Sequence, residues 1–535
     1  MNVAFDPWIP VVTPSGERQL ASLSAVLAEG EKFADLAVRP HERVSLMRFF
    51  LCVAHAALDG PKDYAGWLEV PNRLPEAAAK YLNEWKDCLE LFHKERPWLQ
   101  VATLNPIVVN KSNDDGQGQD WSTLNRLCFT RASGINTTLF DHPSNGGPPT
   151  QYSPGEIVLN LLTFQNFFVA GGKASSRMWG TLEMKNPPNP RGGPCSGKSI
   201  LFTFLRGKNL LESIYLNLST YGDLKLIYGG SSGWLGRPIW EIPIASPSDN
   251  EAIVNATRTH MGRLVPQTRI LRIHEDCKRV LFGAGFLYPK FQDEHNTFTP
   301  DLFATVILNT KRERELLSAK PNSSIWRELH SLTVRSKAAS GSSRGPLCFL
   351  NVPTTSSCDI TADAMITNPR QAAEIVDFLE SVFHIPAQLL TLGGNIAYES
   401  EVKLAELFAS RLNWAIEVYR GEIDGGWEGR LKGAGTSKWE LKAKLSTTAN
   451  THYWTTVEKN LSLLMAHIEA LGTDGALPTR DAWRKMLFST ACDAYRIACG
   501  QDTPRQIRSF AMGWQKLITI KDVAEPDINM TKEGN

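Results

Sequence analysis

The stretch TLGGNIAYESEVKLAELFASRLNWAIEVYR, residues 391–420, marks the point at which the character of the chain changes. It opens with the turn residues Gly393 and Gly394, and from Glu399 onward its apolar residues recur at the spacing of a helix face. Further long helical patterns follow, at residues 453–471, 480–499 and 505–520. Because helices with apolar stripes and short connections are what a four-helix bundle requires, we predict such a bundle over residues 396–535.

Residues 1–395 lack this regularity. Helical patterns alternate there with short β-like runs: the helical patterns cover residues 43–58, 76–95 and 156–169, and the runs cover residues 200–205, 224–228, 270–273, 303–308 and 347–352. The runs are irregularly spaced, and loops rich in Gly, Pro, Ser and Asn separate them. We therefore predict an α+β fold, with a large irregular mixed N-terminal domain followed by a C-terminal four-helix bundle.

The chain of 535 residues carries no excess of either charge: 57 Lys and Arg face 56 Asp and Glu, a formal net charge of +1. This balance excludes a uniformly basic protein that coats nucleic acid, so any such binding must come from a local patch.

Nine cysteines without a C-x-x-C pair argue against a disulfide framework and a zinc ribbon. The N-terminus lacks a signal-peptide pattern, and the most apolar helical stretch contains Arg48 and His55, so we expect a cytoplasmic protein without a membrane span.

Two short motifs raise the alternative of an enzyme. From Gly192 to Ser199 the sequence GGPCSGKS fits the P-loop pattern, but the residues after it favour a strand, whereas phosphate binding needs a helix there. Two G-x-S-x-G matches centre on Ser231 and Ser343, yet neither precedes a helix as a nucleophile elbow requires. A P-loop NTPase or a serine hydrolase is therefore the alternative, and we favour simple turns in each case.

The acidic residues and histidines predict no catalytic or metal site. The pairs at Asp141-His142 and Asp293-Glu-His295 have ligand chemistry, but isolated pairs of this kind are usually solvated loop residues. We therefore predict no catalytic residue, no metal and no cofactor.

Four loops combine glycine with polar, aromatic or basic residues. They are residues 133–142, with Asn136, Phe140 and His142; residues 170–173, with Gly171 and Gly172; residues 285–290, with Lys290; and residues 393–399, with Gly394, Asn395, Tyr398 and Glu399. Glycine lets backbone approach a polyanion, an aromatic ring stacks on a base, and lysine meets a phosphate or a groove edge. Each loop also has the composition of an ordinary turn, so composition alone does not distinguish a nucleic-acid-binding loop from a turn.

In the same order along the chain, these loops resemble those of the CasA family, the large subunit of the type I-E CRISPR Cascade complex. The resemblance opens at Asp6-Pro-Trp-Ile-Pro-Val11 and covers nearly the whole chain. Its main pieces lie at residues 133–142, 161–172, 202–207, 216–218, 238–241, 285–291, 392–394 and 432–435. No single piece is specific, whereas the ordered series is.

The resemblance implies a non-enzymatic subunit. Such subunits lie at the end of the complex that holds the crRNA 5′ handle, recognise the protospacer-adjacent motif in duplex DNA, and help to open the duplex for pairing with the guide RNA. The implied partners are the crRNA 5′ handle, target double-stranded DNA, the handle-binding backbone subunit, the small subunits, and a helicase-nuclease that the assembly recruits. The helical bundle is expected to contact the DNA and the small subunits.

The resemblance also assigns roles to single residues. The loop that contains Phe140 matches the family's handle-docking and motif-sensing loop, where the ring would stack and His142 stands at a polar position. Gly171 and Gly172 match the glycine loop that lets backbone enter the minor groove. Lys290 matches the family's minor-groove lysine, a cation suited to the acceptor-rich floor of A·T pairs.

The turn from Gly394 to Glu399, which includes Asn395, matches the wedge hairpin that splits the first base pair beyond the motif. The family's reference member has glutamine at the wedge tip, where this chain has Glu399 preceded by Tyr398. Because a carboxylate repels phosphate, either Tyr398 is the wedge or the register slips. Some members also carry two C-x-x-C pairs consistent with zinc, whereas this chain has only the isolated Cys277 there, so no structural zinc is expected.

Overall fold

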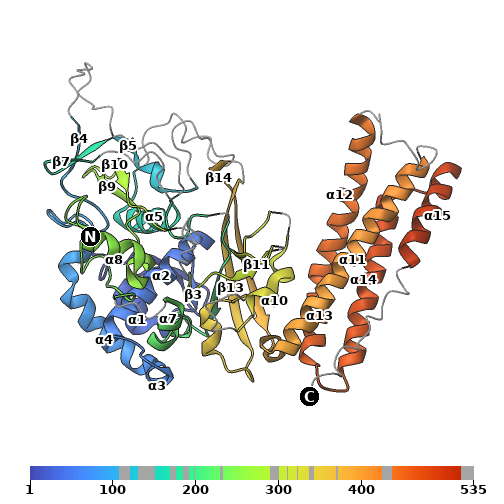
Figure 1. Ribbon diagram of the computed structural model, residues 1–535, viewed down its shortest axis with the longest axis horizontal. Coiled ribbons are helices and arrows are strands. Elements are labelled where there is room, and N and C mark those ends of the chain that lie inside the picture. Colours follow the sequence, from blue (N-terminus) through green and yellow to red (C-terminus); the bar gives the residue numbers. More distant parts are fainter. Residues whose placement is uncertain are drawn as a thin grey trace. The chain divides into compact units, whose positions relative to one another are not determined.

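The computed structural model of the protein places the chain in two compact units (Figure 1). The first comprises residues 1–353 and 357–384, and the second comprises residues 354–356 and 385–535. The described residues are 1–107, 121–130, 151–168, 176–184, 192–197, 199–228, 233–289, 301–309, 311–321, 323–335, 343–368, 371–423 and 436–519. The predicted boundary after residue 395 falls inside a helix, α11 (Leu392–Ile423), and the units divide before that helix begins.

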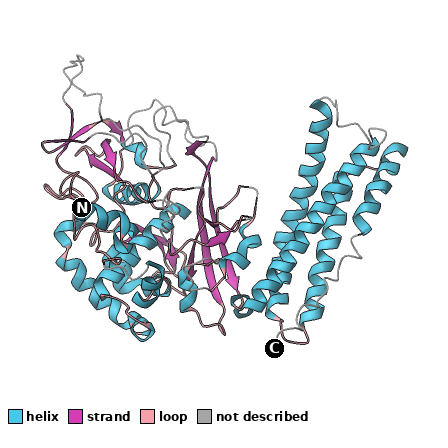
Figure 2. Cartoon of the chain, in the orientation of Figure 1, coloured by secondary structure: helices cyan, strands magenta, loops and turns pink. Residues whose placement is uncertain are grey.

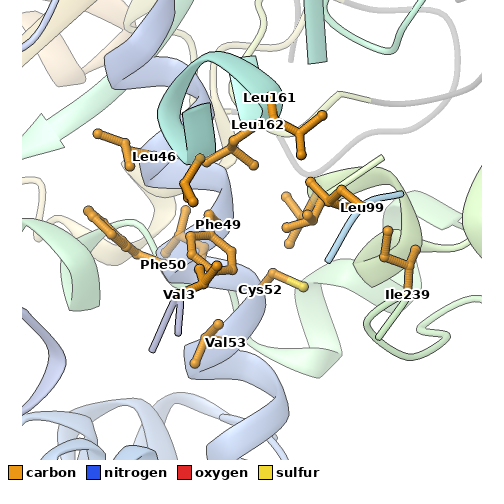
Figure 3. Packing of buried hydrophobic residues seen from close by; sticks show 14 of the residues in the cluster. Val3, Leu46, Phe49, Phe50, Cys52, Val53, Leu99, Leu161, Leu162 and Ile239 are labelled. Carbon is orange, nitrogen blue, oxygen red and sulfur yellow. The ribbon is translucent and has the colours of Figure 1, made fainter. Parts of the chain in front are cut away.

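The core of the first unit forms around helix α2 (Pro40–Leu58), most of whose residues are buried. Pro40 starts the helix, and the Glu42 carboxylate accepts a hydrogen bond of 2.8 Å from the backbone amide of Arg39 at its first turn. Helices α1, α4, α5 and α9 and strand β13 pack against α2. Figure 3 shows the centre of this core, where Phe49 and Phe50 of α2 lie among side chains from several other segments. The predicted buried helix over residues 43–58 is confirmed.

The other helices of the first unit are shorter than α2, and Figure 2 shows helices and small sheets mixed in this unit. Their bounds are α1 (Leu23–Glu29), α3 (Tyr64–Leu68), α4 (Val70–Glu84), α5 (Pro154–Phe167), α6 (Leu210–Leu216), α7 (Tyr221–Tyr228), α8 (Asn250–Arg258), α9 (His260–Leu264) and α10 (Leu329–Leu332). Turns of 3-10 helix link them, among them η1 (Gly30–Lys32), η2 (Lys86–Leu89), η3 (Leu124–Leu127), η5 (Ile325–Glu328) and η6 (Leu347–Asn351).

The strands of this unit form several small sheets rather than one large sheet. Their orders are β2-β1-β3, β5-β10-β9, β11-β12, β14-β13-β8 and β4-β6-β7. The bounds are β1 (Ile9–Val12), β2 (Arg18–Ala21), β3 (Asp35–Leu36), β4 (Leu104–Pro106), β5 (Ser122–Thr123), β6 (Arg177–Trp179), β7 (Leu182–Met184), β8 (Phe202–Arg206), β9 (Arg269–Ile273), β10 (Arg279–Gly285), β11 (Val306–Leu308), β12 (Arg314–Leu316), β13 (Cys358–Asn368) and β14 (Gln371–Ile385). The pairs with a described register are antiparallel, which confirms the α+β class.

The second unit is a helical bundle. After the 3-10 turn η7 (Ala387–Leu390) come α11, α12 (Thr436–Lys459), α13 (Leu461–Glu469), α14 (Ala476–Ala498) and α15 (Pro504–Ile518). Only Asn460 separates α12 from α13, and both pack on α14, while α11 packs on α12, α14 and α15. Within the described residues, no helix combines the length and the apolar character that crossing a bilayer requires.

Two sequence predictions for the first unit are wrong, and two strands were missed. Residues 224–228 belong to helix α7 rather than to a strand, and residues 347–352 are mostly the 3-10 turn η6. The longest strands of the structure, β13 and β14, are absent from the predicted runs. Strand β13 pairs with β8, for example Ile360 with Leu205, so it is stabilised by a partner more than 150 residues away.

Candidate nucleic-acid interface

Most of the predicted site residues lie outside the described residues. These are Asn136, Phe140 and His142 in one segment, Gly171 and Gly172 in a second, and Lys290 in a third. The structure does describe the residues at which each segment leaves the fold. Those attachment points are Phe129 and Thr130, Phe168, and the chain up to Pro289.

The three attachment points meet at the carboxyl-terminal part of α5. The ring of Phe164 lies 6.2 Å from that of Phe129 and 5.2 Å from that of Phe168, between centroids. At the next residue of α5, the side chain of Gln165 forms two hydrogen bonds of 2.8 Å with the backbone of Arg269. Segments that are far apart in sequence therefore start from one contiguous structure.

The third attachment point joins the same structure through strand β9. The Thr268 hydroxyl donates to the carbonyl of Gln165, and the Thr268 carbonyl accepts from the amide of Phe286 at 3.2 Å. The amide of Gln267 donates to the Tyr288 hydroxyl at 2.9 Å. These contacts fix the chain immediately before Lys290 against α5.

Three arginines surround these attachment points, and we call Arg126, Arg177 and Arg269 the arginine cluster. The guanidinium of Arg126 lies 5.0 Å from the ring centroid of Phe282, and Arg177 Nε donates to the carbonyl of the same residue at 3.0 Å. Arg269 lies 4.4 Å from the ring centroid of Phe168. Burial and the positive charge of Arg126 lower the pKa of Arg269 to about 10. The cluster therefore concentrates positive charge beside the start of the candidate loops.

Sequence reasoning missed the arginine cluster. Its members are far apart in the chain, and each lies in a different segment. The available signal was indirect: Arg126 precedes the Phe140 loop, Arg177 follows the Gly171 loop, and Arg269 shares a hairpin with the segment that leads to Lys290.

The residues predicted to form a wedge hairpin are helical. Gly394 to Glu399 form the first turns of α11, so the prediction of a turn there is wrong. Tyr398 is fully buried in the bundle, whereas Asn395 and Glu399 are half-buried and Glu399 forms an ion pair of 2.6 Å with Lys403. Gly394 is buried where a side chain would overlap the carbonyl oxygen of Gln388, which explains a glycine at this position.

The P-loop alternative does not fit the structure. Strand β8 follows the motif where phosphate binding requires a helix. The amides of Gly193 and Cys195 donate to the carbonyls of Phe168 and Asn166, at 2.8 and 3.0 Å, so they are already used at the end of α5. The Ser199 hydroxyl accepts from the amide of Thr367. The glycine-rich motif thus closes a helix end, with Gly193, Cys195 and Ser199 buried and Gly197 exposed.

The serine motifs also lack the geometry of a nucleophile elbow. Ser231 lies outside the described residues, and the segment before it is helix α7 instead of the required strand. Ser343 precedes Arg344, which forms an isolated β-bridge with Val306. The next element is the 3-10 turn η6, where a nucleophile elbow requires an α-helix. The described part of the chain contains no group of three or more His, Cys, Asp or Glu side chains arranged to hold a metal ion.

Fold and site together define a class: a two-unit protein whose α+β unit gathers several loops at one arginine cluster and whose second unit is a helical bundle. The family model described as CRISPR-associated protein Cse1 matches residues 2–494. The chain therefore belongs to the Cse1 family, which confirms the resemblance.

Individual relatives agree with this assignment. The CRISPR-associated protein CasA/Cse1 of Thermus thermophilus is 26% identical over 517 residues, which cover 92% of this chain and 91% of the relative. The crystal structure of Thermus thermophilus CasA has a TM-score of 0.72 at 20% identity and covers 97% of this chain and 99% of its own. Thermobifida fusca Cse1 gives a TM-score of 0.73 at 18% identity, covering 97% of each chain. These structures share the fold of this chain over both of its units.

Proposed function

We propose that this chain is the large subunit of an RNA-guided CRISPR surveillance complex, in which it recognises the protospacer-adjacent motif in duplex DNA. A chain of a structure titled CRISPR RNA-guided surveillance complex shares the fold, with a TM-score of 0.67 at 18% identity, covering 97% of this chain and 99% of its own. The observation that carries the proposal is that the attachment points of three candidate loops meet at α5 beside the arginine cluster. A binding surface for duplex DNA needs several segments presented together.

Each loop has a distinct role in this proposal. The segment with Asn136, Phe140 and His142 docks the crRNA 5′ handle and senses the motif. The backbone at Gly171 and Gly172 enters the minor groove, where side chains would collide with the groove walls. Lys290 supplies a cation to the acceptor-rich groove floor. The loops start from a shared base, which supports their acting on the same stretch of DNA.

The start of α11 is proposed to assist in opening the duplex. Asn395 and Glu399 are accessible there, whereas Tyr398 is buried among the bundle helices and would have to leave that site to contact a base. The geometry therefore favours the exposed edge of the helix start, close to Gly394, over the tyrosine ring as the contacting surface.

The proposed role is non-enzymatic and requires no cofactor. Sequence reading is divided between the motif, which the protein reads, and the protospacer, which the guide RNA reads by base pairing. The proposed partners are the crRNA 5′ handle, target double-stranded DNA, the handle-binding backbone subunit and the small subunits of the complex, and a helicase-nuclease recruited after the duplex opens. Cytoplasmic location is part of the same proposal.

The decisive test is binding of the reconstituted complex, with and without this chain, to duplexes that differ only beside the protospacer. We expect omission of the chain to abolish discrimination between the duplexes, and the Lys290→Ala variant to weaken binding to the preferred duplex. Ser343→Ala is the matched control, since Ser343 belongs to a rejected motif and should leave binding unchanged. Unchanged discrimination without the chain would disprove the proposal.

A further inference from the structure

Arg126 differs from the other members of the arginine cluster because its side chain is exposed. It extends from η3, and its guanidinium lies over the Phe282 ring while Nη1 donates to the Ser122 hydroxyl at 2.9 Å. Within the part of the chain that the structure describes, no carboxylate pairs with it. Most exposed arginines are free to rotate, whereas this one is held by a ring and a hydroxyl.

The surroundings of Arg126 make its positive charge costly. Partial burial lowers the pKa of Arg126, and its charge in turn lowers the pKa of Arg269. Arg269 is almost fully buried, with Nη1 donating to the Gly283 carbonyl at 3.1 Å. The charge of Arg126 therefore acts on Arg269, and an anion bound at Arg126 would stabilise the positive charge at this place.

A phosphate is the anion that fits this arrangement. A guanidinium stacked on an aromatic ring keeps its N–H edges in one plane, and that plane matches the paired oxygens of a phosphate. Phe282 is a residue of strand β10 and packs against Phe164 of α5 with ring centroids 5.5 Å apart, so the platform under Arg126 belongs to the rigid core.

We propose that Arg126, held by Phe282 and Ser122, is a phosphate-binding residue that contacts the sugar–phosphate backbone of a nucleic acid bound beside η3. This inference rests on the proposed function and adds to it a contact from a residue that the structure describes. Backbone contacts of this kind fix the position of a protein on a duplex and carry no sequence information. Arg126 is thus expected to contribute to affinity and register rather than to motif choice.

The test uses the reconstituted complex with the Arg126→Gln variant and compares two binding steps. One arm measures affinity for target duplex as a function of salt, and the other measures association of the chain with a guide-RNA-loaded complex that lacks it. Loss of a contact to duplex phosphate should weaken binding about ten-fold. It should also reduce the slope of log K against log salt by about 0.9. Arg73→Gln is the matched control, since Arg73 is an exposed arginine on α4 without a described ion pair.

The outcomes separate the sources of the phosphate. A change confined to the duplex arm assigns the contact to DNA, and a change confined to the other arm assigns it to the crRNA handle. Ser122→Ala removes the same hydrogen bond inside the protein but keeps the charge, so it should cost far less binding than Arg126→Gln. If Ser122→Ala reproduces the whole loss, or if Arg126→Gln behaves as Arg73→Gln in both arms, the inference is wrong.

Failure of this inference is distinguishable from failure of the proposed function. If Lys290→Ala weakens binding while Arg126→Gln matches the Arg73→Gln control, only the role of Arg126 is disproved. If omission of the chain leaves motif discrimination unchanged, the proposed function is disproved whatever the Arg126 variant does.

Discussion

Two adjacent glycines at the start of α11 have opposite surroundings. A side chain on Gly394 would overlap the carbonyl oxygen of Gln388, whereas one on Gly393 would meet no atom within 4 Å. We expect Gly394→Ala to lower the free energy of unfolding by about 1–3 kcal/mol through overpacking. Gly393→Ala, at a helical position with open space, should raise it by about 0.4–1 kcal/mol. Urea unfolding of the two variants of the full chain measures both effects, and equal shifts would contradict this interpretation.

A single buried carboxyl group should leave a pH signature. Asp363 of β13 is fully buried, and burial raises its pKa to about 8, with Glu380 and Asp35 adding to the shift while Arg43 and Thr361 oppose it. Between its ordinary pKa and 8, the folded chain holds this proton and the unfolded chain does not. The contribution of the group to stability therefore falls as the pH rises through that range.

We expect Asp363→Asn to remove this contribution, so that the melting temperature of the variant falls less than that of the wild type between pH 5 and pH 8. Thermal melting in matched buffers measures the difference. Because all other groups titrate equally in both proteins, parallel curves would show that Asp363 is ionised in the folded state throughout.

At the scale of elements, helices α11 and α14 are joined by a buried ion pair. Arg484 contacts both carboxylate oxygens of Glu401, with a shortest distance of 2.6 Å, and the two side chains are only 17% and 4% exposed. Replacing Glu401 by alanine leaves a buried guanidinium without its carboxylate, and we expect a cost of about 3–5 kcal/mol. The control is Asp493→Ala, which breaks the exposed Asp493–Arg496 pair of α14 and should cost about 0–1 kcal/mol. Urea unfolding measures the loss of unfolding free energy in each variant. Similar losses would show that the buried pair stabilises the bundle no more than the exposed pair does.

The elements that the sequence predicted well are those with local causes. The periodicity of residues 43–58 and the capping box at Ser153 and Glu156 before α5 act within a few residues, and both helices are present. Strand β14 is the contrary case, because its sequence QAAEIVDFLESVFHI contains good helix formers and becomes a strand by pairing with β13. Long-range pairing of this kind has no local signature.

The sequence predicted the candidate loops, which stay a prediction, and it did not predict the arginine cluster beside them. The loops around Phe140, Gly171 and Lys290 were selected by their resemblance to a family, and physical chemistry alone left them as turns. Arg126 and Arg269 are far apart in the sequence and become neighbours only through the packing of η3, α5 and β9, so the sequence does not predict their proximity. The prediction of a hairpin at Gly394 was wrong because a glycine required by close packing reads in sequence like a glycine required by a turn.

For the molecule as a whole, the charge balance limits what the chain does alone. With a formal net charge of +1, its attraction to DNA should rest on a few placed residues. We expect the isolated chain to bind duplex weakly, with a salt dependence that corresponds to few phosphate contacts, and the assembled complex to bind far more tightly. Titration of fluorescent duplex across a salt series tests this. A steep salt dependence of the isolated chain would show a larger basic surface than the described residues contain.

The closing of α5 by the glycine-rich segment has a consequence for any polyanion nearby. A helix ends in a partial negative charge, because its last carbonyl groups point outward without partners, and α5 ends immediately before the segment that contains Gly171 and Gly172. An open end there would repel the backbone of a nucleic acid. The amides of Gly193 and Cys195 cover two of those carbonyls, and the guanidinium of Arg269 stands over the adjoining Phe168 ring. The segment that fits the P-loop pattern thereby neutralises part of the negative end of α5, as the proposed DNA contact of Gly171 and Gly172 would require.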